Sequence, residues 1–150
     1  MNNEFFKEQL RIAELKADEE RKIKDQIKQS KTELLKEFSK PVIDFLFFIH
    51  ENYTFNRNSD YKSDKKLVGY NFTKEYFLER LENTHYRIDI PICGFYTDDG
   101  YVDYIEIRID DNMNCCIVYS KNTTQDIKIF NGLQSFVTDF SLVIAKNRDI

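Results

Sequence analysis

The sequence of 150 residues is 41% hydrophobic and 32% charged, with a formal net charge of −4 at pH 7. This length predicts one domain, and this composition is too apolar for general disorder and too charged for a membrane protein. The longest apolar run, Val42 to Ile49, contains an aspartate and is much shorter than the roughly 20 residues that span a bilayer. The first residues lack the basic and then apolar order of a secretory signal, so we expect a cytoplasmic protein without membrane contact.

Residues 3–39 predict one long helix, because they contain neither glycine nor proline and consist mainly of residues that favour or tolerate a helix. Two acid-first pairs four residues apart, Asp18 with Lys22 and Glu20 with Lys24, are expected to support its solvated turns. We therefore expect residues 1–39 to form an extended charged amphipathic arm, followed by a compact domain over residues 40–150.

The apolar residues of this arm form a thin stripe. Some keep a seven-residue spacing that Glu20 interrupts, which is a broken coiled-coil heptad, while Ile12, Ile23 and Leu34 recur every eleven residues. The partner of such a stripe is a second copy of the chain, another protein, or the chain's own domain. The residues expected to make this oligomerisation or partner contact are Ile12, Leu15, Ile23, Ile27 and Leu34.

Two further helices are expected before the sheet. Pro41 suits the first turn of a second helix that runs to about Asn52, with Ser39 as its cap. The apolar residues of this helix cover more than one face, which places it in the core. Residues 67–72 favour a short strand, and Thr73 is expected to cap a third helix over residues 74–83. This third helix is expected to bury Tyr76, Phe77 and Leu81.

From residue 84 onward the hydrophobic period changes to two, which is typical of half-buried strands. Residues 86–93, 101–110, 115–120 and 126–130 are separated by turn-forming residues and predict an antiparallel meander of about four strands. The chain closes with an amphipathic helix over residues 132–147 that we expect to pack on the apolar face of the sheet. The predicted fold class is therefore α+β.

The motifs of common catalytic and cofactor sites are missing from the sequence. Its four glycines are scattered, whereas a nucleotide-binding loop needs them clustered. The three cysteines indicate neither a disulfide framework nor a zinc site. We interpret His50 as a structural charge partner at a helix end rather than a catalytic base. We accordingly assign no catalytic residue, no metal site and no cofactor.

Acidic residues are concentrated between Tyr86 and Asp111, where seven acids face two arginines. The candidate binding residues are Asp98, Asp99, Asp103, Glu106, Asp110 and Asp111. Carboxylates at this density can hold Mg²⁺, and the run Glu106-Ile107-Arg108 resembles the acidic-x-basic element of metal-dependent nucleases. Those enzymes use lysine in the third position, and a preceding Pro-Asp element is missing. Most of these acids lie in turns, which favours a solvated negative surface over a metal site.

A negative surface repels phosphate, so we expect a protein partner with a basic surface and no direct contact with nucleic acid. The small size and the leading helix favour a non-enzymatic inhibitor, immunity factor or regulator of a larger machine, including one that handles nucleic acid. One alternative is a metal-dependent nuclease or phosphoesterase that uses the acidic cluster. The other is a structural subunit of a multimeric assembly.

Overall fold

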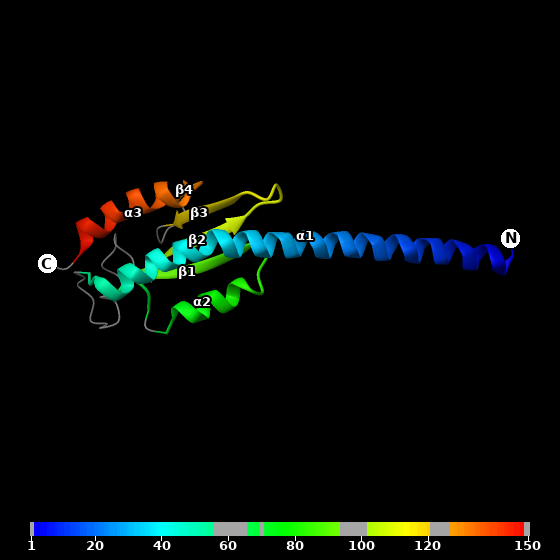
Figure 1. The fold of residues 1–150 in the computed structure, drawn as a ribbon, viewed down its shortest axis with the longest axis horizontal. Coiled ribbons are helices and arrows are strands. Elements are labelled where there is room, and N and C mark those ends of the chain that lie inside the picture. The colour runs from blue at the N-terminus through cyan, green and yellow to red at the C-terminus, as the bar shows by residue number, and fades with distance from the viewer. Residues whose placement is uncertain (1, 56–65, 70, 94–101, 121–126, 149–150) are drawn as a thin grey trace.

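The structure is a computed structural model that describes residues 2–55, 66–69, 71–93, 102–120 and 127–148. Its elements are α1 (Asn3–Asn52), α2 (Lys74–Leu81), β1 (Arg87–Cys93), β2 (Val102–Ile109), β3 (Cys115–Ser120), β4 (Ile127–Phe130) and α3 (Leu133–Asn147). In the described part of the chain, three helices accompany a four-stranded antiparallel sheet of order β1-β2-β3-β4 (Figure 1). The predicted α+β class and the antiparallel meander are therefore confirmed. None of the described helices is both long and apolar enough to cross a membrane.

The helix α1 runs without interruption through Pro41, so the prediction of a separate helix that starts there is wrong. Ser39, the predicted cap, is fully buried in the middle of α1. Proline inside a helix removes one backbone hydrogen bond and costs about 3 kcal/mol. Packing outweighs this cost, because α1 buries residues on both sides of Pro41. These are Leu35 and Ser39 before it, and Val42, Ile43, Leu46, Phe47 and Ile49 after it.

The sheet buries one face under the helices. Alternate residues of its strands reach this face, as the period of two predicted: Ile88, Ile90 and Ile92 in β1, Ile105, Ile107 and Ile109 in β2, and Ile117 and Tyr119 in β3. They form one hydrophobic cluster with side chains from α1, α2 and α3. Tyr86 precedes β1 and is 58% exposed, although the predicted strand began there.

The strand predicted over residues 67–72 does not form among the described residues. Val68 makes only an isolated bridge to Ile92, and the N–H of Cys93 donates to the carbonyl oxygen of Leu67 at 2.7 Å. Leu67 and Val68 are nevertheless fully buried. The hydrophobicity of this segment therefore reports its burial and not a strand.

The helix α2 begins at the predicted cap, since the Thr73 hydroxyl accepts a hydrogen bond from the N–H of Tyr76 at 3.1 Å. It ends at Leu81, two residues before the predicted end. Phe77 and Leu81 are fully buried as predicted. Tyr76 is 38% exposed, so its predicted burial is wrong. Its ring lies beside the guanidinium group of Arg80 instead, with 5.7 Å from the guanidinium carbon to the ring centroid.

The helix α3 packs on the sheet, as predicted for the last segment, and it also packs on α1. Phe136 and Phe140 stack at 5.2 Å between ring centroids. Phe136 also meets Phe45 of α1 at 5.9 Å and Phe130 of β4 at 5.5 Å, in edge-to-face geometry. Aromatic rings therefore join α3 to both the long helix and the edge of the sheet.

His50 lies in the last turn of α1 and has a structural role, although not through a positive charge. Its Nδ1 accepts a hydrogen bond from the N–H of Val68 at 3.0 Å, so the imidazole is neutral at that nitrogen. Burial, with a smaller contribution from the charge of Lys66, holds the pKa of His50 below its usual value. The predicted helix-end charge is thus replaced by a hydrogen-bond acceptor that fixes the segment 66–69.

This contact predicts a pH dependence of stability near neutrality. The unfolded chain protonates His50 at about pH 6.5, whereas the folded chain resists protonation, so its contribution is complete above about pH 6.5 and is lost as the pH falls below that value. We expect the free energy of unfolding, measured with urea, to fall between pH 7.5 and 5.5. This slope should flatten in His50→Gln and persist in His85→Gln. A wild-type slope that survives in His50→Gln would contradict the assignment.

Candidate protein-binding surfaces

The amino-terminal part of α1 extends beyond the rest of the molecule, and Figure 1 shows it as a projecting blue rod. The projecting part, residues 3–30, is shorter than the predicted arm of residues 1–39 and spans about 42 Å at 1.5 Å per residue. From here on we call residues 3–30 the arm. The first buried residue of α1 is Leu35. Eight large apolar side chains of the arm and its base are 38% to 62% exposed: Phe5, Phe6, Leu10, Ile12, Leu15, Ile23, Ile27 and Leu34. The arm therefore presents apolar surface without contacting the sheet that covers the rest of α1.

The predicted contact residues of α1 do not all share one side of the helix. At about 100° per residue, Ile12, Ile23, Leu34 and Ile27 fall within about 60° of one another. We call these four residues the stripe. Leu15 lies about 60° away from Ile12, on the side opposite to the other three residues. The structure thus leaves four of the five predicted residues on one continuous helical face.

The charges of the arm pair differently from the prediction. Ion pairs form between residues three apart, from Arg11 to Glu8 at 2.6 Å and from Arg21 to Asp18 at 3.1 Å. The predicted pairs of Asp18 with Lys22 and of Glu20 with Lys24 do not form. Across the described ranges, Glu20 and Lys24 take part in no ion pair.

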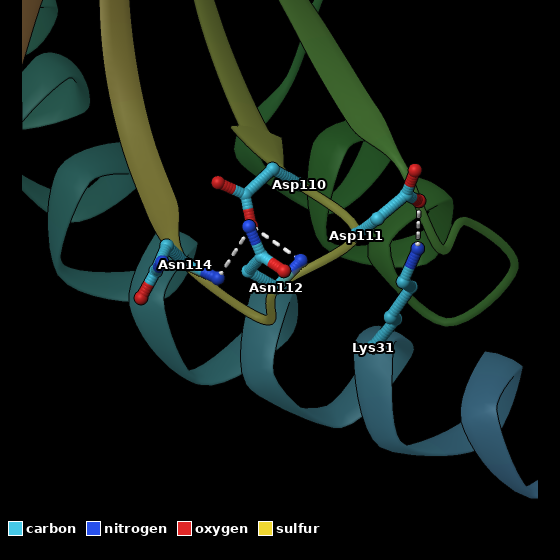
Figure 2. A network of polar contacts seen from close by, with 5 residues as sticks. All are labelled: Lys31, Asp110, Asp111, Asn112 and Asn114. Atoms are coloured by element: carbon cyan, nitrogen blue, oxygen red, sulfur yellow. Dashed lines mark hydrogen bonds and ion pairs between the residues drawn. The ribbon is translucent and has the colours of Figure 1, made fainter.

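An ion pair fixes the base of the arm to the turn between β2 and β3 (Figure 2). The Lys31 ammonium lies 2.9 Å from Oδ1 of Asp111, and the Lys31 side chain is only 14% exposed. This contact holds the pKa of the Asp111 carboxyl below its usual value, through the hydrogen bond first and the charge second. Nearby, the thiol of Cys115 contacts the carbonyl oxygen of Leu34 at 3.9 Å. Both contacts fix the direction of the arm relative to the sheet and the other helices, which together we call the body.

Burial removes one of the six candidate acids from the surface. Asp103 is only 2% exposed, because it shares the inward face of β2 with Ile105. Its Oδ2 accepts a hydrogen bond from the Tyr119 hydroxyl at 2.5 Å. Asp103 therefore does not belong to the exposed acidic surface that we predicted. Asp98 and Asp99 lie outside the described residues.

The remaining candidate acids contact their own chain. Asp110 organises the turn after β2, where its Oδ1 accepts hydrogen bonds from the N–H groups of Asn112 and Asn114, each at 2.9 Å (Figure 2). These bonds support Met113 in a left-handed conformation with φ of 65°. Glu106 lies on the outer face of the sheet, 3.7 Å from Arg108. Within the described ranges, no three histidine, cysteine, aspartate or glutamate side chains are placed to hold a metal ion.

The turn role of Asp110 predicts that acceptor geometry matters there and charge does not. Asp110→Asn keeps an oxygen acceptor and should change the free energy of unfolding by less than about 0.5 kcal/mol. Asp110→Ala leaves two N–H groups without this acceptor and should cost about 1 to 2 kcal/mol. Urea denaturation of both variants measures the difference. Equal losses for both substitutions would show that the charge is what stabilises the turn.

One surface was missed by the sequence predictions. A depression of about 320 Å³ lies where α2 ends and β1 begins. Its lining residues are Tyr76, Glu79, Arg80, Asn83, Thr84, Tyr86 and Arg87. The spacing of Tyr76 and Arg80 predicts that they share a helix face. The approach of Tyr86 and Arg87 depends on the path of the connecting turn, which no local pattern reports. Two guanidinium groups make this depression partly cationic, in contrast to the acidic surface that we predicted.

No known protein family, characterised protein or solved structure matches the chain. The functional conclusion therefore rests on the contacts, burial and charges of its own residues.

Proposed function

We propose that the protein is a non-enzymatic interaction protein whose arm binds another polypeptide. Inhibitors, immunity factors and regulators of larger machines belong to this class. The observation that carries the proposal is the exposure of large apolar side chains along a helix segment that its own domain leaves uncovered. An amphipathic helix with such a face binds a hydrophobic groove or a second helix.

Energetics support a partner for the arm. Most of the stability of a helix in a protein comes from packing of its apolar face, and intrinsic propensity adds little. Full burial of one aliphatic side chain contributes about 1.5 to 3 kcal/mol. The four residues of the stripe are at least 38% exposed, so a partner gains part of this energy at each of them. Contact along the stripe therefore stabilises both the complex and the helical arm.

The arm supports the proposal better than the acidic residues do. A basic partner surface would have to meet Glu106, Asp110 and Asp111, and each of these already contacts its own chain. We therefore propose electrostatic attraction only as an addition to contact along the arm. A structural subunit of an assembly would use the same stripe and would differ in the number of copies.

Affinity capture with the full chain as bait tests the proposed function. We expect wild type to retain proteins, including untagged copies of the chain, that Ile23→Glu does not retain. Ile127→Glu is the matched control, because Ile127 is a similarly exposed isoleucine in β4 at 52% against 56% for Ile23. Identical sets of captured proteins for wild type and Ile23→Glu would overturn the proposal.

A further inference from the structure

We propose that the polypeptide bound by the arm is a second copy of this chain, paired antiparallel along α1 about a two-fold axis beside Ile23. This inference rests on the proposed function and names its partner. It commits to the direction and the register of the helix pair. The spacing of the stripe, the charges beside it and the exposure of its far end each support this arrangement.

The spacing of three stripe residues is the same in both chain directions from Ile23. Ile12 and Leu34 each lie eleven residues from Ile23. Eleven residues make about three helical turns, so all three side chains remain on one side of α1. Turning a second copy around Ile23 places Ile12 opposite Leu34 of that copy, and Ile23 opposite itself. An antiparallel pair therefore closes three apolar layers with one register.

Two charges beside the stripe complement each other in the same register. Glu20 and Lys24 lie on one flank of the stripe, three residues before and one residue after Ile23. In an antiparallel pair the same flanks meet with the chain direction reversed. Glu20 then lies about two residues, or roughly 3 Å along the axis, from Lys24 of the second copy. The two-fold axis makes this contact twice, between charges that form no ion pair in the described single chain.

A parallel pair in register loses this contact. Opposite flanks of the two helices meet in a parallel pair, so Glu20 of one copy does not lie beside Lys24 of the other. The parallel pair also places Lys16, which lies on the same side of the helix as the stripe, against its own copy. The antiparallel pair moves Lys16 opposite Ser30. Charge complementarity therefore favours the antiparallel direction.

The far end of the stripe is free to receive the amino terminus of the second copy. Leu34 and Pro41 remain exposed although neighbouring residues of α1 are buried in the body. In the proposed register Phe5 of one copy reaches Pro41 of the other, and Phe5 is 47% exposed in the single chain. The paired region spans about 36 residues of each helix, or roughly 54 Å. The exposed aromatic residue at the tip of each arm thereby gains an apolar neighbour.

Charge reversal in the full chain tests both the partner and the direction. Glu20→Lys and Lys24→Glu each replace two attractive contacts by two repulsive ones, and each should raise the dimer dissociation constant about tenfold. The double variant restores attraction in the antiparallel pair and should return the constant to within about threefold of wild type. Sedimentation equilibrium over a range of concentrations measures these constants.

A second charged pair controls for changes within the helix itself. Asp18 and Lys22 have the same four-residue separation but lie on the side of α1 away from the stripe. Asp18→Lys and Lys22→Glu alter the charge of the arm equally and should leave the dissociation constant within about threefold of wild type. Equal weakening by these controls would show that the effect comes from helix stability and would overturn the proposed contact.

The other outcomes also decide the proposal. A chain that stays monomeric at high micromolar concentration, a higher oligomer, or a double variant as weak as the single variants would each overturn it. The proposed function has a separate test. A monomeric wild type that still captures a different protein through Ile23 would refute the second copy and keep the arm as a binding surface. A monomer whose captured proteins do not depend on Ile23 would refute both.

Discussion

Phe136→Ala is expected to lower the free energy of unfolding by about 3 to 5 kcal/mol, which is a large part of the stability of a domain of this size. The side chain of Phe136 is fully buried, and its ring touches those of Phe45, Phe130 and Phe140. Removing the ring leaves a cavity at the point where α1, β4 and α3 meet. Urea denaturation followed by circular dichroism measures the loss.

Leu142→Ala is the matched control for this prediction. Leu142 lies on the same helix and is 56% exposed. Its truncation should cost less than about 1 kcal/mol, because little apolar contact is removed. A loss at Phe136 no larger than that at Leu142 would contradict the position of α3 against α1 and the sheet.

Ile23→Glu is expected to abolish binding through the arm while the body remains folded. In the proposed pair Ile23 lies against its own copy, so the substitution brings two carboxylates into an apolar contact. We expect the dissociation constant to rise by a factor of about 100 or more, which corresponds to about 2.7 kcal/mol. Because Ile23 is 56% exposed in the single chain, the urea midpoint of the body should change little. Sedimentation equilibrium and urea denaturation separate these two effects.

Leu15→Glu provides the closest control on the same helix. Leu15 is 54% exposed, nearly the same as Ile23, but it lies outside the stripe. Its substitution introduces the same charge into the same solvated arm and should raise the dissociation constant less than about tenfold. Equal losses at both positions would mean that any charge disrupts the arm, and the stripe would then have no special role.

Local patterns in the sequence predicted most of the fold. The alternating isoleucines of β1 and β2 share one buried face because one side of each strand meets the helices. Thr73 caps α2 because its hydroxyl satisfies a backbone N–H at the start of the helix. Pro41 predicts a helix start because its ring suits a first helical turn, whereas inside a helix it costs about 3 kcal/mol. Only the burial of Leu35 and Val42 on either side shows that the helix continues.

The candidate surfaces were less predictable, since they depend on contacts between distant segments. The eleven-residue spacing of Ile12, Ile23 and Leu34 is local, and it identified the stripe. The contacts of the acidic residues, by contrast, involve residues that are distant in the sequence. Asp103 meets Tyr119 sixteen residues later, and Asp111 meets Lys31 eighty residues earlier. The sequence therefore shows that negative charges are concentrated in this segment, but it does not show which residues contact them in the fold.

Amide hydrogen exchange along α1 of the full chain tests most directly whether pairing with a second copy covers the arm. We expect residues 42–49 to exchange slowly at every concentration, since the body buries this part of the helix. Residues 3–30 should exchange rapidly in dilute solution and become protected as dimers form at higher concentration. Exchange of residues 3–30 that stays rapid up to high micromolar concentration would contradict the account.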